Sequence, residues 1–219
     1  MTIEQNLAAL TTRAPGSLLP QVLLETGLAD GYVPHEVPTG QMFVSFNQDG
    51  SSSSTLGGDR SDVEDRFEPQ FGRPVFPVTE LPARLDLALE KSLRTNRLGS
   101  LPIDWSGMSE FQQAVLRKTT EILPGEVRPY SWIAKEIGNP NAVRAVGTAL
   151  ARNPVPIVVP CHRVVRNDGR LGNYYYGTAV KRAVLAAEGL DIDGMDDRIA
   201  RRVRLLGSDT TNVFCYPTC

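Results

Sequence analysis

The sequence predicts a mixed α/β (α+β) protein with an N-terminal α/β part and a mostly helical, winged-helix-like C-terminal domain. Three observations predict it. Residues 41–46 (QMFVSF) alternate roughly as a short strand does. Residues 62–71 and 80–93 look helical, and the second segment has no helix breaker after Pro82. Residues 130–137 and 141–152 are two short helical segments joined by a tight turn, the outline of a helix-turn-helix.

The N-terminal half divides by composition. Residues 1–35 are expected to hold two helices as an extension, and residues 36–95 to form the α/β domain. Within that domain, the Ser/Gly-rich stretch Ser51–Asp62 is expected to be a loop. Residues 96–106 are expected to be a linker into a second domain.

The second domain, residues 107–190, has clearer helix signals. Ser109 and Gln112 have capping-box spacing before a helical repeat that Pro124-Gly125 ends. Gly138-Asn139-Pro140 forms the turn between the next two helices, and Asn153-Pro154 stops the second of them. Residues 191–219 are expected to be a tail.

Length and composition narrow the class of protein. The chain has 219 residues, of which 41% are apolar, enough for one or two globular domains with a core. No apolar run reaches the roughly 18 residues that suggest a membrane span, and the N-terminus lacks the order of a secretory signal. Three cysteines do not make a disulfide framework. We expect a cytoplasmic protein with reduced thiols and no membrane partner.

Charge is distributed unevenly along the chain. Residues 96–190 carry 12 lysines and arginines against 7 aspartates and glutamates, whereas the rest carries 11 against 18. A basic segment in an acidic chain suggests an anionic partner. An ordinary solvated surface explains the same counts, because DNA-binding domains are usually more basic than this.

The stretch Ile157–Val165 carries the candidate chemistry. An apolar run leads into Pro160, then Cys161 and His162. A histidine that takes the thiol proton activates a cysteine as a nucleophile, and a carboxylate can orient that histidine. The alternative is a buried structural cysteine beside a solvent-facing histidine.

The helix before this stretch is rich in small residues. They are Ala142, Ala145, Gly147, Ala149 and Ala151, and Arg144 stands among them. Small side chains let a helix backbone approach a groove closely. The alternative is that the alanines merely favour helix and that Arg144 is solvated.

From about Phe111 to Leu190 the chain resembles the C-terminal domain of the O6-alkylguanine-DNA alkyltransferases, also called methylated-DNA–protein-cysteine methyltransferases. The residues that carry the resemblance are GNPNAVRAVGTALARNPVPIVVPCHRVV and LGNYYYGTAVKRAVLAAEGL. They stand in family order and spacing over roughly 80 residues. Residues ~36–95 resemble the family's variable N-terminal domain in pattern only, with VSFNQDG as a strand and turn.

The resemblance implies direct repair of DNA. Cys161 would accept the methyl or alkyl group of O6-alkylguanine, or of O4-methylthymine, and be consumed, with no cofactor. His162 would deprotonate Cys161 through a water, with Glu188 orienting His162. Tyr130 would promote base flipping and protonate the guanine ring. Asn153 would brace the active-site turn, and Arg163 would be a buried structural arginine.

The resemblance also implies a monomer that binds alkylated double-stranded DNA through the minor groove, in the cytoplasm or nucleoid. Arg144 would fill the gap left by the flipped base. The other residues implied at the DNA are Tyr130, Ala142, Ala145, Gly147 and Arg152. The residues implied at the pocket for the flipped base are Pro156, Val164, Leu171, Gly172, Asn173, Tyr174, Tyr175 and Tyr176.

Two features depart from the family pattern. Tyr175 and Tyr176 replace small loop residues of vertebrate-like members, which suggests a tight pocket that prefers methyl to bulky groups. The C-terminal Cys215 and Cys219 resemble the first cysteine pair of the zinc domain of adaptive-response proteins. That domain needs four cysteines, so the pair would hold zinc only if the set were completed elsewhere. The alternative is a frayed tail with two idle thiols.

Three other functions compete with alkyl transfer. A non-enzymatic lesion-binding protein of the same fold would lack the acceptor cysteine, and Cys161 is present. A regulatory helix-turn-helix protein would have no use for Cys161, His162 and Glu188. A cysteine hydrolase would need an oxyanion pocket, which nothing in the sequence resembles.

Overall fold

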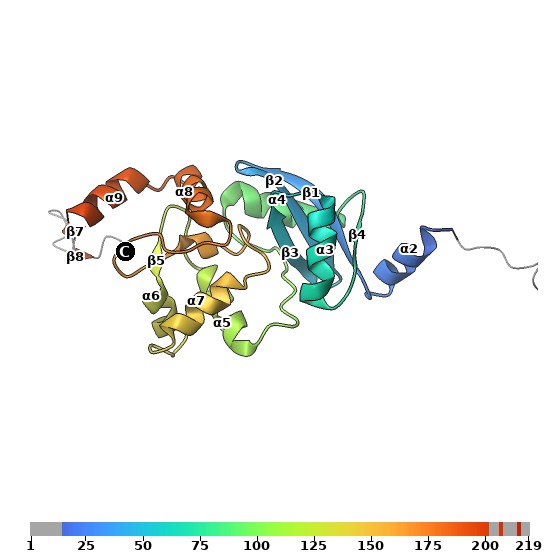
Figure 1. Cartoon of the computed structure of the whole chain (residues 1–219), viewed down its shortest axis with the longest axis horizontal. Coiled ribbons are helices and arrows are strands. Elements are labelled where there is room, and N and C mark those ends of the chain that lie inside the picture. Colours follow the sequence, from blue (N-terminus) through green and yellow to red (C-terminus); the bar gives the residue numbers. More distant parts are fainter. Residues whose placement is uncertain (1–14, 202–205, 208–213, 216–219) are drawn as a thin grey trace, which may run out of the picture.

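A computed structural model describes residues 15–201, 206–207 and 214–215, and confirms the mixed α/β fold class. A sheet with its helices lies beside a helical C-terminal half (Figure 1). The N-terminal half contains α2 (Leu18–Glu25), β1 (Asp30–Val37), β2 (Gly40–Asn47), β3 (Gly50–Leu56), α3 (Arg60–Phe71), β4 (Val75–Pro77) and α4 (Ala83–Thr95). The C-terminal half contains α5 (Glu110–Thr119), β5 (Arg128–Pro129), α6 (Tyr130–Glu136), α7 (Val143–Ala151), the 3-10 helix Cys161–Arg163, β6 (Val164–Val165), α8 (Gly177–Ala187) and α9 (Ile192–Ala200).

The sheet has the strand order β3-β2-β1-β4, with β4 parallel to β1 and the other pairs antiparallel. Its two faces pack differently, because successive side chains of a strand point to opposite sides. Tyr32 and Phe43 form one apolar cluster with Val63 and Phe67 of α3. Their neighbours Val33, Met42 and Val44 belong to the main core, which also takes in α4 and much of the C-terminal half. The two halves therefore share one core.

The loop predicted over Ser51–Asp62 was wrong for most of its length, because residues 51–56 belong to strand β3, residues 60–62 begin α3, and only residues 57–59 lie outside a helix or strand. Ser51, Ser52, Ser53 and Ser54 are all buried. One side of β3 pairs with β2, and the other side pairs with the linker and with the turn before Cys161. Backbone pairing on both sides satisfies the strand without apolar side chains, so the composition gave no sign of it.

The extension expected over residues 1–35 differs from the structure at its end. Strand β1 begins at Asp30, inside that range, and pairs with both β2 and β4. Ahead of it lies α2, while residues 1–14 lie outside the described part. The sheet therefore begins earlier than the composition suggested.

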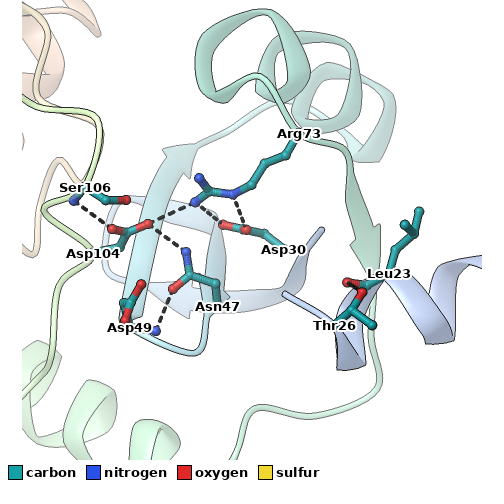
Figure 2. A network of polar contacts seen from close by, with 8 residues as sticks. All are labelled: Leu23, Thr26, Asp30, Asn47, Asp49, Arg73, Asp104 and Ser106. Atoms are coloured by element: carbon teal, nitrogen blue, oxygen red, sulfur yellow. Dashed lines mark hydrogen bonds and ion pairs between the residues drawn. The ribbon is translucent and has the colours of Figure 1, made fainter. Parts of the chain in front are cut away.

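The linker segment is packed rather than exposed. Leu101 and Ile103 are buried in the main core, and Ile103 bridges Ser51 of β3. Figure 2 shows the Arg73 guanidinium between the carboxylates of Asp30 and Asp104. Arg73 Nε lies 2.5 Å from Asp30 Oδ1, and its Nη2 lies 2.9 Å from Asp104 Oδ2. This charge network ties β1 and the turn between α3 and β4 to the linker.

The C-terminal half contains the predicted helix-turn-helix. Ser109 Oγ accepts a hydrogen bond from Gln112 N at the start of α5, as the capping spacing predicted. Helices α6 and α7 match the two short helices, and Gly138 has the positive φ that their turn requires. Strands β5 and β6 form a short parallel pair beside them. This arrangement fixes the position of the chain from Asn153 to Val165.

The expected tail begins with a packed helix. Ile192 and Met195 of α9 are buried with Val165 and Leu185, so the structured part extends past Leu190. Beyond α9, β7 (Leu206–Gly207) pairs with β8 (Phe214–Cys215), and Cys219 lies outside the described residues. Within the described ranges, no helix is long and apolar enough to span a bilayer.

Candidate active site

Cys161 lies at the start of the 3-10 helix, after the buried run Val158–Pro160. The side chain is 9% exposed and lines a cleft of about 600 Å³ between the two halves. Burial raises the pKa of the Cys161 thiol, and a hydrogen bond from Asn153 opposes that rise. The thiol is therefore reachable from the cleft, but it needs a base to become a strong nucleophile at neutral pH.

His162 forms a buried pair with Glu188, as the resemblance implied. Its Nε2 lies 3.0 Å from Glu188 Oε1, and the ring is fully buried. Burial works to raise the pKa of Glu188, but hydrogen bonds from His162 and Arg163 outweigh it and hold the pKa below its usual value. An ionised carboxylate only accepts hydrogen bonds, so Nε2 carries the proton and Nδ1 keeps its lone pair.

Nδ1 of His162 is thus the basic nitrogen of the site. It is buried and has no hydrogen-bond partner within the described residues. Burial lowers the pKa of His162, against the opposing effect of Glu188, so the ring is neutral at pH 7. A neutral imidazole with a free lone pair can accept a proton.

Arg163 is buried, as expected. Its guanidinium donates to both oxygens of Glu188, at 2.6 and 2.8 Å, and to the backbone oxygens of Ile122 and Asn96. These bonds fix the carboxylate that in turn fixes His162. Arg163 therefore joins three segments at the base of the site, namely those that directly follow α4, α5 and α8.

Asn153 connects the turn after α7 to the reacting sulfur. Its Nδ2 donates to Cys161 Sγ at 3.2 Å and to Val159 O at 3.0 Å. Its Oδ1 accepts from Val155 N at 3.0 Å. Each of these bonds lies within the segment 153–161, the turn that the resemblance implied Asn153 would brace.

Tyr130 begins α6, and its ring lies against two glycines. A Cβ on Gly172, which has φ +69°, would lie 3.4 Å from Tyr130 Oη, and one on Gly147 would lie 4.0 Å from Cε1. Burial and the neighbouring Cys161 raise the pKa of Tyr130, so its hydroxyl stays protonated and can donate.

Helix α7 exposes the face that the resemblance assigned to DNA. Arg144, Ala145 and Arg152 are exposed, and Ala142 and Gly147 are half-buried. The opposite face, with Val146, Ala149 and Leu150, is buried in the core. Within the described part of the chain, the Arg144 side chain makes no ion pair.

The expected pocket residues fall into two groups. Pro156, Tyr174, Tyr175 and Tyr176 line the cleft with Cys161. Val164 and Leu171 do not line it, because both side chains are buried in apolar clusters. Gly172 and Asn173 also lie outside the cleft lining, with Gly172 facing Tyr130 instead.

Sequence reasoning missed two residues that support the site. Lys181 of α8 is fully buried and donates from Nζ to Val164 O and Leu171 O, at 2.6 and 2.5 Å. Its helical spacing to Val184 and Leu185, both buried, was a usable signal. Ser54 of β3 contacts the turn at Pro154 and Pro156. No local pattern could reveal that contact, because about 100 residues separate the partners.

The described residues contain no cluster of three or more histidine, cysteine or acidic side chains that could hold a metal ion. Of the tail pair, Cys215 lies in β8 and Cys219 lies outside the described residues. Cys161, beside the buried pair of His162 and Glu188, can act as a nucleophile.

Known proteins resemble this chain in both sequence and structure. A family model described as "6-O-methylguanine DNA methyltransferase, DNA binding domain" matches residues 110–190. Over 81 residues the chain is 51% identical to a methylated-DNA–protein-cysteine methyltransferase of Methanosarcina acetivorans, covering 37% of this chain and 52% of that relative. The chain thus spans about half the length of the curated relatives it matches.

Solved structures cover more of the chain. The crystal structure of the Mycobacterium tuberculosis O6-methylguanine methyltransferase is 30% identical with a TM-score of 0.58, covering 73% of this chain and 92% of that one. A crystal structure of the M. tuberculosis OGT in complex with DNA is 28% identical with a TM-score of 0.57, covering 73% and 93%. The similarity therefore includes the sheet of the N-terminal half.

Proposed function

The chain belongs to the O6-methylguanine DNA methyltransferase family, and on that premise we propose that it repairs DNA by transferring an alkyl group to Cys161. The observation that carries the proposal is the position of Cys161. Its sulfur lines the cleft and accepts a hydrogen bond from Asn153. The next residue in the chain is His162, which forms the buried pair with Glu188. The family match and the DNA-bound relative support DNA as the partner.

The transfer follows from these groups. His162 Nδ1 takes the thiol proton through a water, and the sulfur attacks the alkyl carbon on O6 of guanine. The carbon–oxygen bond breaks with its electron pair going to O6, while the Tyr130 hydroxyl protonates the guanine ring. The product is a thioether, which has no easy leaving path. One chain therefore removes one alkyl group and is spent, and no cofactor takes part.

The DNA would be bound as a duplex through its minor groove, by one chain acting alone. The exposed small residues of α7 suit a close approach of the helix, and Arg144 would enter the stack in place of the flipped base. Because the proposed substrate is DNA, we propose that the protein lies in the cytoplasm or is associated with the nucleoid.

We also propose that the pocket favours methyl over bulky alkyl groups. Tyr174 and Tyr176 have ring centroids 5.7 Å apart, and Tyr175 packs edge-on against Tyr176 at 5.0 Å. The Tyr176 hydroxyl accepts a hydrogen bond from Leu56 N of β3 at 3.0 Å. This wall of the cleft is therefore held in place from the N-terminal half.

The direct test is mass spectrometry after incubation with an oligonucleotide that carries one O6-methylguanine. We expect the peptide that contains Cys161 to gain one methylene, with a yield of at most one per chain. Cys161→Ala is expected to abolish transfer and to keep DNA binding, measured by fluorescence anisotropy. Transfer of labelled methyl by that variant would refute the assignment. Lesion-specific binding by the native chain without loss of the Cys161 thiol would favour a lesion-binding protein instead.

A further inference from the structure

Strand β3 of the N-terminal half contacts the turn that precedes Cys161. Ser54 N donates to Pro154 O at 2.9 Å, and Ser54 Oγ donates to Pro156 O at 2.5 Å. Ser54 is only 4% exposed, so water competes little for these bonds. A single serine therefore holds two carbonyl groups of the turn.

The turn that Ser54 holds is the one that carries Asn153. Asn153 precedes Pro154, and its side chain reaches across the turn to Val155 N, Val159 O and Cys161 Sγ. These contacts require the backbone of residues 153–159 to keep one shape, because the amide must reach all three groups at once. A shift of the Pro154 or Pro156 carbonyl would move the amide away from the sulfur.

The same turn contains a strained residue. Ile157 has φ +73°, in the left-handed region that β-branched residues rarely adopt. The peptide group that joins Pro156 to Ile157 supplies the carbonyl that Ser54 Oγ holds. Such a conformation persists only where the surroundings hold it, and Ser54 is one of the groups that do so.

We propose that Ser54 is a positioning residue for the Cys161 thiol, acting through the turn and the Asn153 amide. This inference rests on the proposed function only in taking an alkyl group on DNA as the target of the thiol; the positioning of the thiol is argued from the contacts alone. The Asn153 amide opposes the effect of burial on the pKa of Cys161. Losing Ser54 would therefore make the thiol harder to ionise as well as loosen the turn.

The test measures the reactivity of Cys161 itself. Native protein, Ser54→Ala and Ser52→Ala react with iodoacetamide from pH 6 to 10, and the peptide that contains Cys161 is followed by mass spectrometry. Ser52 is the matched control, because it lies on the same strand, is 1% exposed, and its Oγ has no partner in the described residues. Methyl transfer from an O6-methylguanine oligonucleotide is measured in parallel.

For Ser54→Ala we expect the pH profile to move up by about one unit, and alkylation at pH 7.5 to slow about tenfold. Ser52→Ala should match the native profile. Ser54→Thr keeps the hydroxyl and should also match it, which separates the hydrogen bond from loss of folding. An unchanged profile for Ser54→Ala, with only a lower unfolding temperature, would overturn the proposal.

A double-mutant cycle tests the route of the effect. If Ser54 acts through Asn153, then Ser54→Ala adds nothing to the slower alkylation of Asn153→Ala. If Ser54→Ala slows alkylation of Cys161 in the Asn153→Ala variant as much as it does in the native protein, the proposal is overturned. If the native chain transfers no methyl group while Ser54→Ala still shifts the alkylation profile, the proposed function fails and the positioning role of Ser54 stands.

Discussion

His162 is the one of the two histidines of the chain that lies in the site, and its burial shapes how the protein responds to acid. Because burial lowers its pKa in the folded state, His162 stays neutral until the pH falls well below 6.5. Its role as a base should therefore persist into mildly acidic conditions. Folding stability responds differently, because the unfolded chain takes up a proton near pH 6.5.

We predict that stability falls as the pH drops below about 6.5. At pH values between the folded-state and the unfolded-state pKa of His162, the unfolded protein binds more protons than the folded protein. The contribution of His162 to folding stability is therefore fully present above about pH 6.5 and is lost as the pH falls through this range. His162 contributes at most about 1.4 kcal/mol per pH unit. Urea unfolding from pH 7.5 to 5.5 measures this slope. His162→Gln should reduce the slope, and equal slopes for the native protein and this variant would contradict the prediction.

A second prediction at this scale concerns the tyrosine wall of the cleft. Replacing Tyr176 with glycine removes the ring that packs against Tyr174 and Tyr175. We expect the rate with O6-benzylguanine to rise relative to O6-methylguanine by about tenfold, equivalent to about 1.4 kcal/mol in the barrier. Tyr176→Phe, which keeps the ring and loses the bond from Leu56 N, is the control and should retain the native ratio. Equal native rates for the two substrates would remove the basis of the prediction.

Among the elements, α8 is fixed to the active-site segment by a charged residue. Lys181 joins Val164 O, beside the 3-10 helix, to Leu171 O, before the tyrosines. Burial lowers the pKa of Lys181 to about 8, so most of the side chain is charged at pH 7. The ammonium thus donates to the carbonyl groups of Val164 and Leu171 at once.

We predict that Lys181→Met destabilises the fold by about 1–3 kcal/mol, because two buried carbonyl groups lose their donor. Arg182→Met is the control on the same helix. Its partly exposed pairs with Asp193 and Asp196 should contribute no more than about 1 kcal/mol. Urea unfolding of the two variants gives the comparison. A smaller effect for Lys181→Met than for Arg182→Met would show that the buried ammonium is not the main link.

The helices were predictable from the sequence because their signals are local. The cap at Ser109 and the breakers after Arg152 act within a few residues. Strand β3 was not predictable, because its serines are buried by pairing with segments far away in the chain. In the same way Cys161 and His162 stand side by side in one short stretch, and the family resemblance of the surrounding residues implied their roles and that of Asn153, whereas nothing local indicated Ser54.

Over the whole molecule, Arg73 holds two buried carboxylates together. The Asp30 side chain is fully buried and that of Asp104 is 4% exposed, and burying a carboxylate is costly unless an opposite charge is paired with it. Asn47 Nδ2 and Ser106 N add hydrogen bonds to Asp104. The network joins the sheet to the linker that leads to the helical half (Figure 2).

We predict that Arg73→Met destabilises the protein by about 3–5 kcal/mol, since it leaves two buried carboxylates unpaired. The matched control is Arg66→Met, because Arg66 pairs with Asp62 four residues away on the surface of α3. That loss should cost about 0.3–0.5 kcal/mol. Thermal and urea unfolding measure both. Similar losses for the two variants would mean that the network contributes no more than a surface ion pair.

The shared core has a consequence for any attempt to divide the protein. Cleavage of the chain between Leu98 and Gly107 would expose the apolar side chains of Leu101 and Ile103 to solvent. It would also leave the backbone hydrogen-bonding groups on the outer side of β3 unpaired. Neither fragment would then be a self-sufficient folding unit, and each would be prone to aggregate. Activity should return only when both fragments are refolded together, as a complemented pair.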